Sequence, residues 1–223
     1  MDTDKLPSIS RPETLRETVQ THLRDAIMNG RFAPGERLIE RELCDMLKVS
    51  RPPLREALRL LEAEKLIQLI PNRGPVVARI GVEEARELYA LRGLLEGFAA
   101  HEFARLASDE QVALLGEKVK GLHVFLEHPD RKGLLAMKSQ FYDVLLDGAG
   151  NRLINEVLTG LLSRVNLLRA TSFSRPERLA QSLVEIDNLF EAIQRRDATQ
   201  AQRLATLHIH NAQAVALAIL EQN

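Results

Sequence analysis

The chain has 223 residues, and its 45% hydrophobic content is enough to build the core of one large domain or of two small ones. The single cysteine, Cys44, excludes both a disulfide framework and a thiolate zinc cluster within one chain. No apolar run approaches the roughly 18 residues of a membrane span. The N-terminal residues MDTDKLPSIS are polar and acidic, so we expect a soluble, cytoplasmic protein of two domains that does not enter a membrane.

The charge is divided unevenly, although the formal net charge is only −1. Residues 1–80 hold 14 Lys/Arg against 12 Asp/Glu, which is an excess of +2, and the remainder holds 16 against 19. This excess is too small to prove a polyanionic partner, because phosphate binding needs positive charge that is clustered in space. Whether the sequence indicates a polyanionic partner therefore depends on where these cations lie.

Residues 1–12 mix charge, Ser and Pro without periodicity and are predicted to be a mobile tail. Residues 13–79 are predicted to form the first domain. Its first helix is indicated by apolar residues at four-residue steps from Leu15 to Ile27, ending near Gly30. A short second helix follows in LIERELCDMLKV and a third in VSRPPLREALRLLEAEKL, at residues 49–66. LIQLIPNRGPVVARI then indicates two short strands joined by a glycine turn.

The third helix carries an apolar side and a row of cations beside it. Arg51, Arg55 and Arg59 step by four residues and flank an apolar side formed by Leu54, Ala57, Leu58 and Leu61. Three helices followed by a strand pair are typical of a winged helix-turn-helix domain, whose third helix lies in the DNA major groove. Such a row is also compatible with a merely solvated face. Arg41 in the second helix and the hairpin tip Asn72-Arg73-Gly74 favour DNA.

Two prolines, Pro52 and Pro53, define the start of this helix, because the first turn has no internal partners for its N–H groups. If Ser50 is the N-cap residue, the positions that normally donate to a cap are these two prolines, which have no N–H. The Ser50 hydroxyl is then available to a phosphate oxygen at the positive end of the helix dipole.

Residues 80–223 are predicted to form an antiparallel all-α bundle of six to seven helices. The first helix places Leu88, Leu91, Leu95, Phe98 and Ala99 on one side, which we expect to face the core. SDEQ at 108–111 and Asp197 with Gln200 have the capping-box pattern of a helix start, and DGAGNRL interrupts the helices at 147–153.

Residues 30–77, GRFAPGERLIERELCDMLKVSRPPLREALRLLEAEKLIQLIPNRGPVV, resemble the winged-helix domain of the GntR family of bacterial transcription regulators. The matching pattern includes Pro-Gly, Val-Ser-Arg, Pro, Arg-Glu-Ala-Leu and the wing glycine. The resemblance implies that DNA is contacted by Arg41, Arg51 and Arg55, and by Arg73 and Gly74 in a minor groove; the capping argument adds Ser50. Lys65 departs from the family, which usually has glycine before the first wing strand.

The rest of the chain resembles the FadR-type (FCD) effector domain, through LYALRGLLEGFAAHEFA and GAGNRLINEVL. The resemblance implies a ligand cavity within the bundle and, in many members, a divalent metal held by one Asp and three His. The corresponding positions here read Lys138, Tyr142, Ile186 and His208. One imidazole cannot hold such a metal and an ammonium group repels it, so we expect no metal and no other cofactor.

The residues at the family's metal-ligand positions lead to a hypothesis about the effector. Lys138, one turn from Tyr142, supplies the positive charge that the metal offers elsewhere in the family, and Arg92 adds a bidentate contact for a carboxylate. We therefore expect a small anionic effector, a carboxylate, to bind Arg92, Lys138, Tyr142 and His208. Two alternatives stay open: Lys138 extends to solvent, and His208 is a hydrogen-bonded core histidine.

These features predict a ligand-responsive transcription regulator, a repressor that binds a palindromic double-stranded DNA operator as a homodimer. Two half-sites are expected because a single winged helix offers few base contacts. An enzyme is disfavoured, since the sequence has no Ser/His/Asp or Cys/His set and no glycine-rich phosphate loop. The alternative is a helical-bundle interaction protein with a DNA-binding head and no small ligand.

Overall fold

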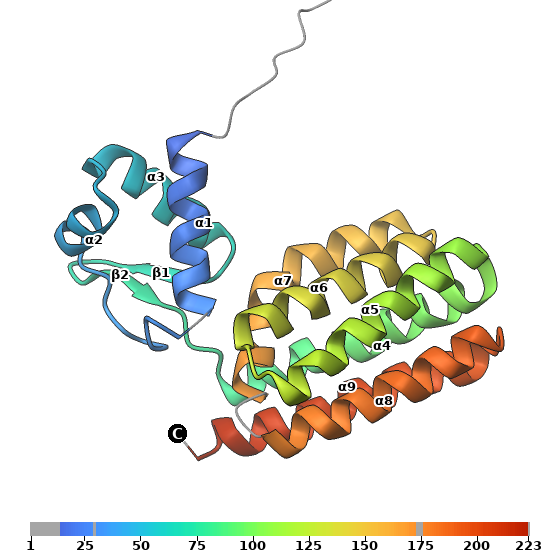
Figure 1. Cartoon of the computed structure of the whole chain (residues 1–223). Helices are drawn as coiled ribbons and strands as arrows, with labels where there is room; N and C mark the ends of the chain where they lie inside the picture. The colour runs from blue at the N-terminus through green and yellow to red at the C-terminus, as the bar shows by residue number, and fades with distance from the viewer. Residues whose placement is uncertain (1–13, 29, 173–175, 223) are drawn as a thin grey trace, which may run out of the picture. The chain divides into compact units, whose positions relative to one another are not determined.

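The computed structural model describes residues 14–28, 30–172 and 176–222, so the predicted tail at residues 1–12 lies outside the described residues. The chain divides into two compact units, one through Ala78 and the other from Arg79 onward. The predicted fold class is confirmed: among the described residues, three helices and a two-stranded hairpin are followed by helices alone (Figure 1). None of the helices in the described part has the length and apolar character needed to cross a bilayer.

The first unit is a winged helix-turn-helix. It consists of α1 (Leu15–Met28), α2 (Glu40–Leu47), α3 (Arg51–Ala63), β1 (Ile67–Ile70) and β2 (Gly74–Val77). The strands are antiparallel, with Ile67 opposite Val77 and Ile70 opposite Gly74. The segment before α2 borders the hairpin, because the Leu38 N–H donates to the Pro75 carbonyl oxygen at 2.8 Å and the Val77 N–H donates to the Glu36 carbonyl oxygen at 2.9 Å. These bonds anchor the wing beside α2.

The core of this unit holds α3 against α1. The four apolar α3 residues predicted to face inward are all buried, and they pack with α1 and β1 side chains that include Val19, Leu23, Ile27 and Ile67. The Glu64 carboxylate at the end of α3 accepts from Arg24 on α1, with Nε to Oε2 at 2.9 Å and Nη2 to Oε1 at 2.5 Å. Apolar burial and this ion pair fix the orientation of α3.

Lys65 adopts the backbone conformation that favours glycine, with φ at 61°. The Lys65 N–H donates to the Glu62 carbonyl oxygen and the Leu66 N–H donates to the Leu61 carbonyl oxygen, at 2.9 and 3.0 Å. This is the Schellman motif that ends many helices, and Leu66 and Leu61 supply its apolar contact. Lysine in place of the family's usual glycine therefore preserves the turn, but it puts a side chain in a strained backbone conformation.

The second unit is a bundle in which α4 packs against α9, with α5, α6, α7 and α8 beside them (Figure 1). Its helices are α4 (Val82–Leu106), α5 (Asp109–Glu127), α6 (Arg131–Gly148), α7 (Arg152–Ser172), α8 (Pro176–Gln194) and α9 (Ala198–Leu220). The predicted capping box at Ser108 and Gln111 is confirmed in both directions. At the start of α9, the Asp197 side chain accepts from the Gln200 N–H.

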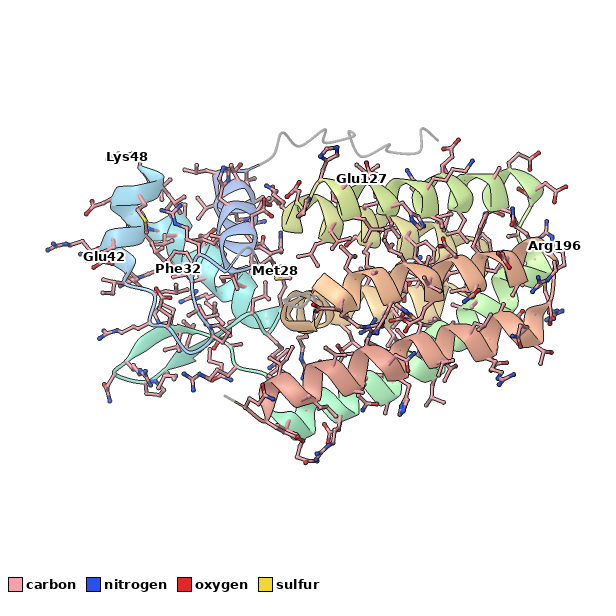
Figure 2. All side chains as sticks on the ribbon, turned by 60° about the horizontal axis from the view of Figure 1, so that its bottom comes forward. Met28, Phe32, Glu42, Lys48, Glu127 and Arg196 are labelled. Atoms are coloured by element: carbon pink, nitrogen blue, oxygen red, sulfur yellow. The ribbon has the colours of Figure 1, made fainter. Side chains whose placement is uncertain are left out.

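Arg196 joins two helix junctions of the bundle, and Figure 2 labels it at the turn between α8 and α9. Its guanidinium group donates to the Ala107 carbonyl oxygen and to Asp109 Oδ1, both at 2.6 Å. The orphan carbonyl at the end of α4 and the acidic first turn of α5 are thereby bound to the α8–α9 turn.

The predicted inward face of α4 is partly wrong. Leu88 and Ala99 are buried, but Leu91 and Phe98 are 38% and 40% exposed. Arg92 and Glu96 are buried instead, and the Arg92 Nε donates to Glu96 Oε1 at 2.7 Å. The α4 side chains that reach the bundle interior thus include an ion pair, which a count of apolar residues alone does not predict.

Candidate DNA-binding surface and ligand site

The three predicted α3 arginines are all exposed. Arg51 is the first residue of α3, and Arg55 and Arg59 follow at one-turn intervals beside the buried apolar side. Arg41, in the first turn of α2, is exposed as well. Lys48, which Figure 2 labels at the end of α2, is exposed at the tight turn between α2 and α3, where its φ is 54°. Sequence reasoning did not include Lys48.

Arg55 has a fixed partner within the chain. Its Nε donates to both carboxylate oxygens of Glu40, at 3.1 and 3.0 Å, while its side chain stays 60% exposed. Glu40 is the first residue of α2, so this ion pair connects the two helices of the helix-turn-helix. The hydrogen bonds to Glu40 involve only Nε, so they do not use the two terminal nitrogens of the guanidinium fork.

Ser50 is the N-cap residue of α3, with φ −76° and ψ 165°, and its side chain makes no capping hydrogen bond. Pro52 and Pro53 occupy the second and third helical positions, which removes the N–H groups that a cap normally accepts from. The Ser50 side chain is exposed. The arrangement agrees with the reasoning from the two prolines.

The wing tip exposes Arg73 in a turn with two positive φ angles, 61° at Asn72 and 83° at Gly74. A Cβ added at Gly74 would meet nothing within 4 Å, so the glycine is required by the backbone conformation rather than by crowding within the chain. The open space above Gly74 allows close approach by another molecule.

In the bundle, the four predicted ligand residues are all buried: Arg92, Lys138, Tyr142 and His208. Lys138 Nζ donates to Ser182 Oγ on α8 at 2.9 Å, so the side chain does not extend to solvent. The Lys138 charge acts on the His208 ring, and the Tyr142 side chain acts electrostatically on Arg92. The fold therefore gathers these residues from α4, α6 and α9 into one interior region.

His208 is hydrogen-bonded to Glu185 on α8, with Nδ1 to Oε2 at 2.6 Å. Burial lowers the His208 pKa to about 4, and the Lys138 charge lowers it further against the opposing effect of Glu185. Burial alone would raise the Glu185 pKa, but hydrogen bonds from His208 and Arg178 lower it to about 2. Near neutral pH the carboxylate is therefore ionised and the imidazole neutral, which requires the proton on Nδ1.

Glu185 has two further donors. Arg178 forms a bidentate pair with it, Nη1 to Oε1 and Nη2 to Oε2, both at 2.8 Å. Asn211 on α9 donates from Nδ2 to Oε1 at 2.8 Å. Sequence reasoning missed Arg178, Glu185 and Asn211. The available signal was the spacing of Arg178, Ser182 and Glu185 at i, i+4 and i+7, which puts polar groups on one side of α8.

Arg92 forms the other half of this interior region. Its guanidinium carbon lies 5.1 Å from the centroid of the Tyr89 ring, and the Arg92 Nη1 atom has no hydrogen-bond partner among the described residues. Burial works against the charged form, but the Glu96 carboxylate, with smaller contributions from Tyr142 and Tyr89, outweighs it, so the Arg92 pKa is raised. Arg92 therefore stays a cation inside the bundle.

A hollow of about 670 Å³ opens between α8 and α9. The described residues that line it are Ala180, Gln181, Val184, Glu185, Asn211 and Ala214. Two of them, Glu185 and Asn211, belong to the hydrogen-bonded group around Glu185, so the hollow reaches the buried cluster at that point. None of the four predicted ligand residues lines it directly.

The residues do not fit the metal that many FCD domains hold. Lys138, Tyr142 and Ile186 take three of the four ligand positions. Ile186 is buried in the apolar core, and the Lys138 charge acts on the one remaining imidazole, His208. Among the described residues there is no group of three His, Cys, Asp or Glu side chains placed to hold an ion. A cationic amine in this position opposes a divalent metal.

A winged helix with outward arginines, joined to a helical bundle with a buried polar cluster, defines a class of DNA-binding regulators. The family model described as bacterial regulatory proteins, gntR family, matches residues 15–77, and the FCD domain model matches residues 87–211. The chain belongs to the GntR family and carries an FCD domain, so it is a DNA-binding transcriptional regulator rather than an enzyme.

Relatives match along most of the chain. The HTH-type transcriptional repressor RspR of Escherichia coli is 27% identical over 214 residues, 95% of this chain and 92% of that protein. The gluconate operon transcriptional repressor of Bacillus licheniformis is 34% identical over 137 residues, 61% of this chain and 54% of that protein. A GntR regulator from Rhodococcus sp. RHA1 has a similar fold, with a TM-score of 0.80 at 24% identity, covering 91% of this chain and 97% of that one.

Proposed function

We propose that this regulator is a repressor that binds a palindromic operator as a homodimer and responds to a small anionic metabolite. Residues 13–79 would read DNA, and residues 80–223 would bind the effector and dimerise. The observation that carries the proposal is the division of α3, which buries its apolar side and leaves Arg51, Arg55 and Arg59 exposed. A helix of this kind presents cations along a groove while its packing fixes its orientation.

The DNA contacts divide by chemistry. Arg51 and Arg55 have the forked donors that read base edges or adjacent phosphates, whereas Arg41 and Ser50 bind phosphates and position the protein without specifying sequence. Arg73 enters the minor groove, where Gly74 allows the backbone to come close. All these residues except Gly74 have exposed side chains, which supports the assignment.

An apolar face of α4 supports the homodimer. Leu91, Leu94 and Phe98 lie at i, i+3 and i+7 on one side of the helix, and Leu94 is 74% exposed. A contiguous exposed apolar stripe of this kind marks an interaction site. We assign it to a second copy of the chain, because two half-sites on one duplex need two reading heads.

The buried charges support an anionic effector. The cluster holds three cationic side chains, Arg92, Lys138 and Arg178, against two carboxylates, Glu96 and Glu185. This excess of one positive charge favours an anion over a cation in a region of low dielectric, where charge interactions are strong. By linkage, an effector that weakens operator binding binds the operator-bound protein less tightly by the same factor.

The test is operator retention by a variant. Arg55→Ala is expected to lose at least about fivefold in affinity for a duplex that the protein selects from a random pool, since one good arginine contact is worth about 1–3 kcal/mol. Arg152→Ala is the matched control, because the Arg152 side chain on α7 is 92% exposed and belongs to the other unit. If Arg55→Ala retains the duplex as well as the wild type in a gel-shift titration, Arg55 does not belong to the DNA-binding surface.

The alternative is a bundle that mediates protein contacts without a small ligand. It is favoured by the same exposed stripe on α4. A thermal-shift screen against a panel of carboxylic acids distinguishes the two: a regulator with an effector gains stability with at least one acid, because a ligand that binds only the folded state stabilises it.

A further inference from the structure

We propose that Arg178, Asn211 and His208 form a receptor for a carboxylate group, which Glu185 occupies as an internal competitor. A monocarboxylate with an apolar body then binds by exchanging with the Glu185 side chain. The inference rests on the proposed effector function, because it names the groups that would hold the effector.

The Glu185 carboxylate has a full set of hydrogen bonds. Its two oxygens accept from four donors: Oε1 from Arg178 Nη1 and Asn211 Nδ2, and Oε2 from Arg178 Nη2 and His208 Nδ1. A carboxylate has about four acceptor sites, so Glu185 has no acceptor left for an incoming amine. A positively charged ligand therefore gains little from this carboxylate. An anion gains the whole donor set if Glu185 leaves.

Glu185 and its donors differ in how far they are exposed at the hollow. Arg178 and His208 are almost fully buried, with side chains 3% and 6% exposed, whereas that of Glu185 is 18% exposed and borders the hollow. Its neighbour Val184 is 59% exposed. The donors are thus held by packing, while the acceptor lies at an opening through which its side chain can rotate to solvent.

The exchange of Glu185 for a ligand carboxylate leaves the charge and the hydrogen bonding of the receptor unchanged. One carboxylate leaves and one enters, so the buried charge and the number of hydrogen bonds stay the same. The free energy of binding must then come from the body of the ligand. The hollow offers Ala180, Val184 and Ala214 to that body. Each methylene buried there tightens binding by up to about fourfold.

This predicts an order of ligands. n-Hexanoate is expected to bind the protein more tightly than acetate, and also more tightly than gluconate, whose hydroxyl groups lose water against apolar walls. Hexylamine, which has the same chain and the opposite charge, is expected not to bind.

The main experiment removes the Glu185 carboxylate, so that its donors are left for an added carboxylate. In Glu185→Ala, sodium acetate is expected to raise Tm with the logarithm of its concentration above Kd, by about 3 °C once acetate exceeds its Kd about tenfold, with sodium chloride adjusted to keep ionic strength constant. Glu191→Ala is the control, because Glu191 lies on the same helix and its side chain is 62% exposed. Neither the control nor the wild type is expected to respond to acetate in this way. A Glu185→Ala protein that responds no more than Glu191→Ala overturns the proposal.

A second pair of variants keeps the test decisive if Glu185→Ala does not fold. Glu185→Gln keeps the size of the side chain but turns an amide donor toward the arginine, so it competes less well. It is expected to bind n-hexanoate about tenfold more tightly than the wild type by calorimetry. Arg178→Met is expected to abolish binding. Equal affinities in Glu185→Gln and wild type, or binding of hexylamine, contradict the exchange.

Gel shifts separate this inference from the proposed function. If acetate rescues Glu185→Ala but n-hexanoate leaves operator affinity of the wild type unchanged, the receptor exists and the effector function fails. If a different metabolite changes operator affinity while acetate does not rescue Glu185→Ala, the function stands and the receptor is wrong.

Discussion

Glu40 and Arg55 join the two helices of the DNA-binding motif, with Arg55 Nε 3.0 Å from one carboxylate oxygen of Glu40 and 3.1 Å from the other. Glu40 begins α2, and Arg55 lies one turn into α3. The carboxylate thereby holds an exposed guanidinium group in one orientation and places a negative charge beside it.

Glu40→Gln is therefore expected to lower sequence discrimination without lowering total DNA affinity. Loss of the acidic group strengthens non-specific attraction to phosphates, while Arg55 is no longer oriented. We expect the ratio of specific to non-specific affinity to fall about tenfold, as one arginine–base contact is lost. Competition gel shifts with the selected duplex and a scrambled duplex at one salt concentration measure this ratio. A ratio equal to that of the wild type means that Glu40 does not position Arg55.

Lys65→Gly is expected to stabilise the first unit by about 1 kcal/mol, because Lys65 has φ of 61°, a conformation that costs an L-residue roughly that amount. Lys65→Ala is the matched control, since alanine removes the lysine side chain and keeps the Cβ. The unfolding transition of this unit in urea should move for glycine and not for alanine. Equal shifts in both variants would assign the effect to the lysine side chain.

The His208 pKa of about 4 makes the folded state depend on pH. The unfolded imidazole binds a proton near its ordinary pKa of about 6.5, whereas the folded one does so only near 4. The stabilisation is complete above about pH 6.5 and is lost as pH falls toward 4, by about 3 kcal/mol in all. His208→Asn, which does not titrate, should lack this part of the pH dependence in urea unfolding series. An unchanged slope between these pH values in the variant would contradict the burial effect.

Leu94→Glu is expected to make the protein monomeric, because it places a charge in the middle of the apolar α4 stripe. The control is Leu126→Glu on α5, which is 45% exposed. Sedimentation equilibrium of both variants measures the oligomeric state. A monomeric wild type, or a dimeric Leu94→Glu protein, removes the stripe from the proposed interface.

The sequence determined the local elements. The apolar steps in α1 and α3, the prolines at the start of α3, and Ser108 with Gln111 each depend on neighbours a few residues away, so they could be read before the fold was known. The exposure of the three α3 arginines follows from the same helical period, because it is fixed once the apolar side is buried.

Only the tertiary structure decided which polar groups meet in the bundle. Arg92 was expected to contact a ligand, but its partner Glu96, buried beside it, was not expected, and Glu185 receives donors from Arg178, seven residues away on α8, and from His208 and Asn211 on α9. Whether a charged residue on an amphipathic helix faces solvent or the interior depends on partners that other helices bring. His208 and Asn211 are distant in sequence from Glu185, so no local pattern contains these contacts, and the spacing of Arg92 with Glu96 or of Arg178 with Glu185 within one helix does not show that the pair is buried.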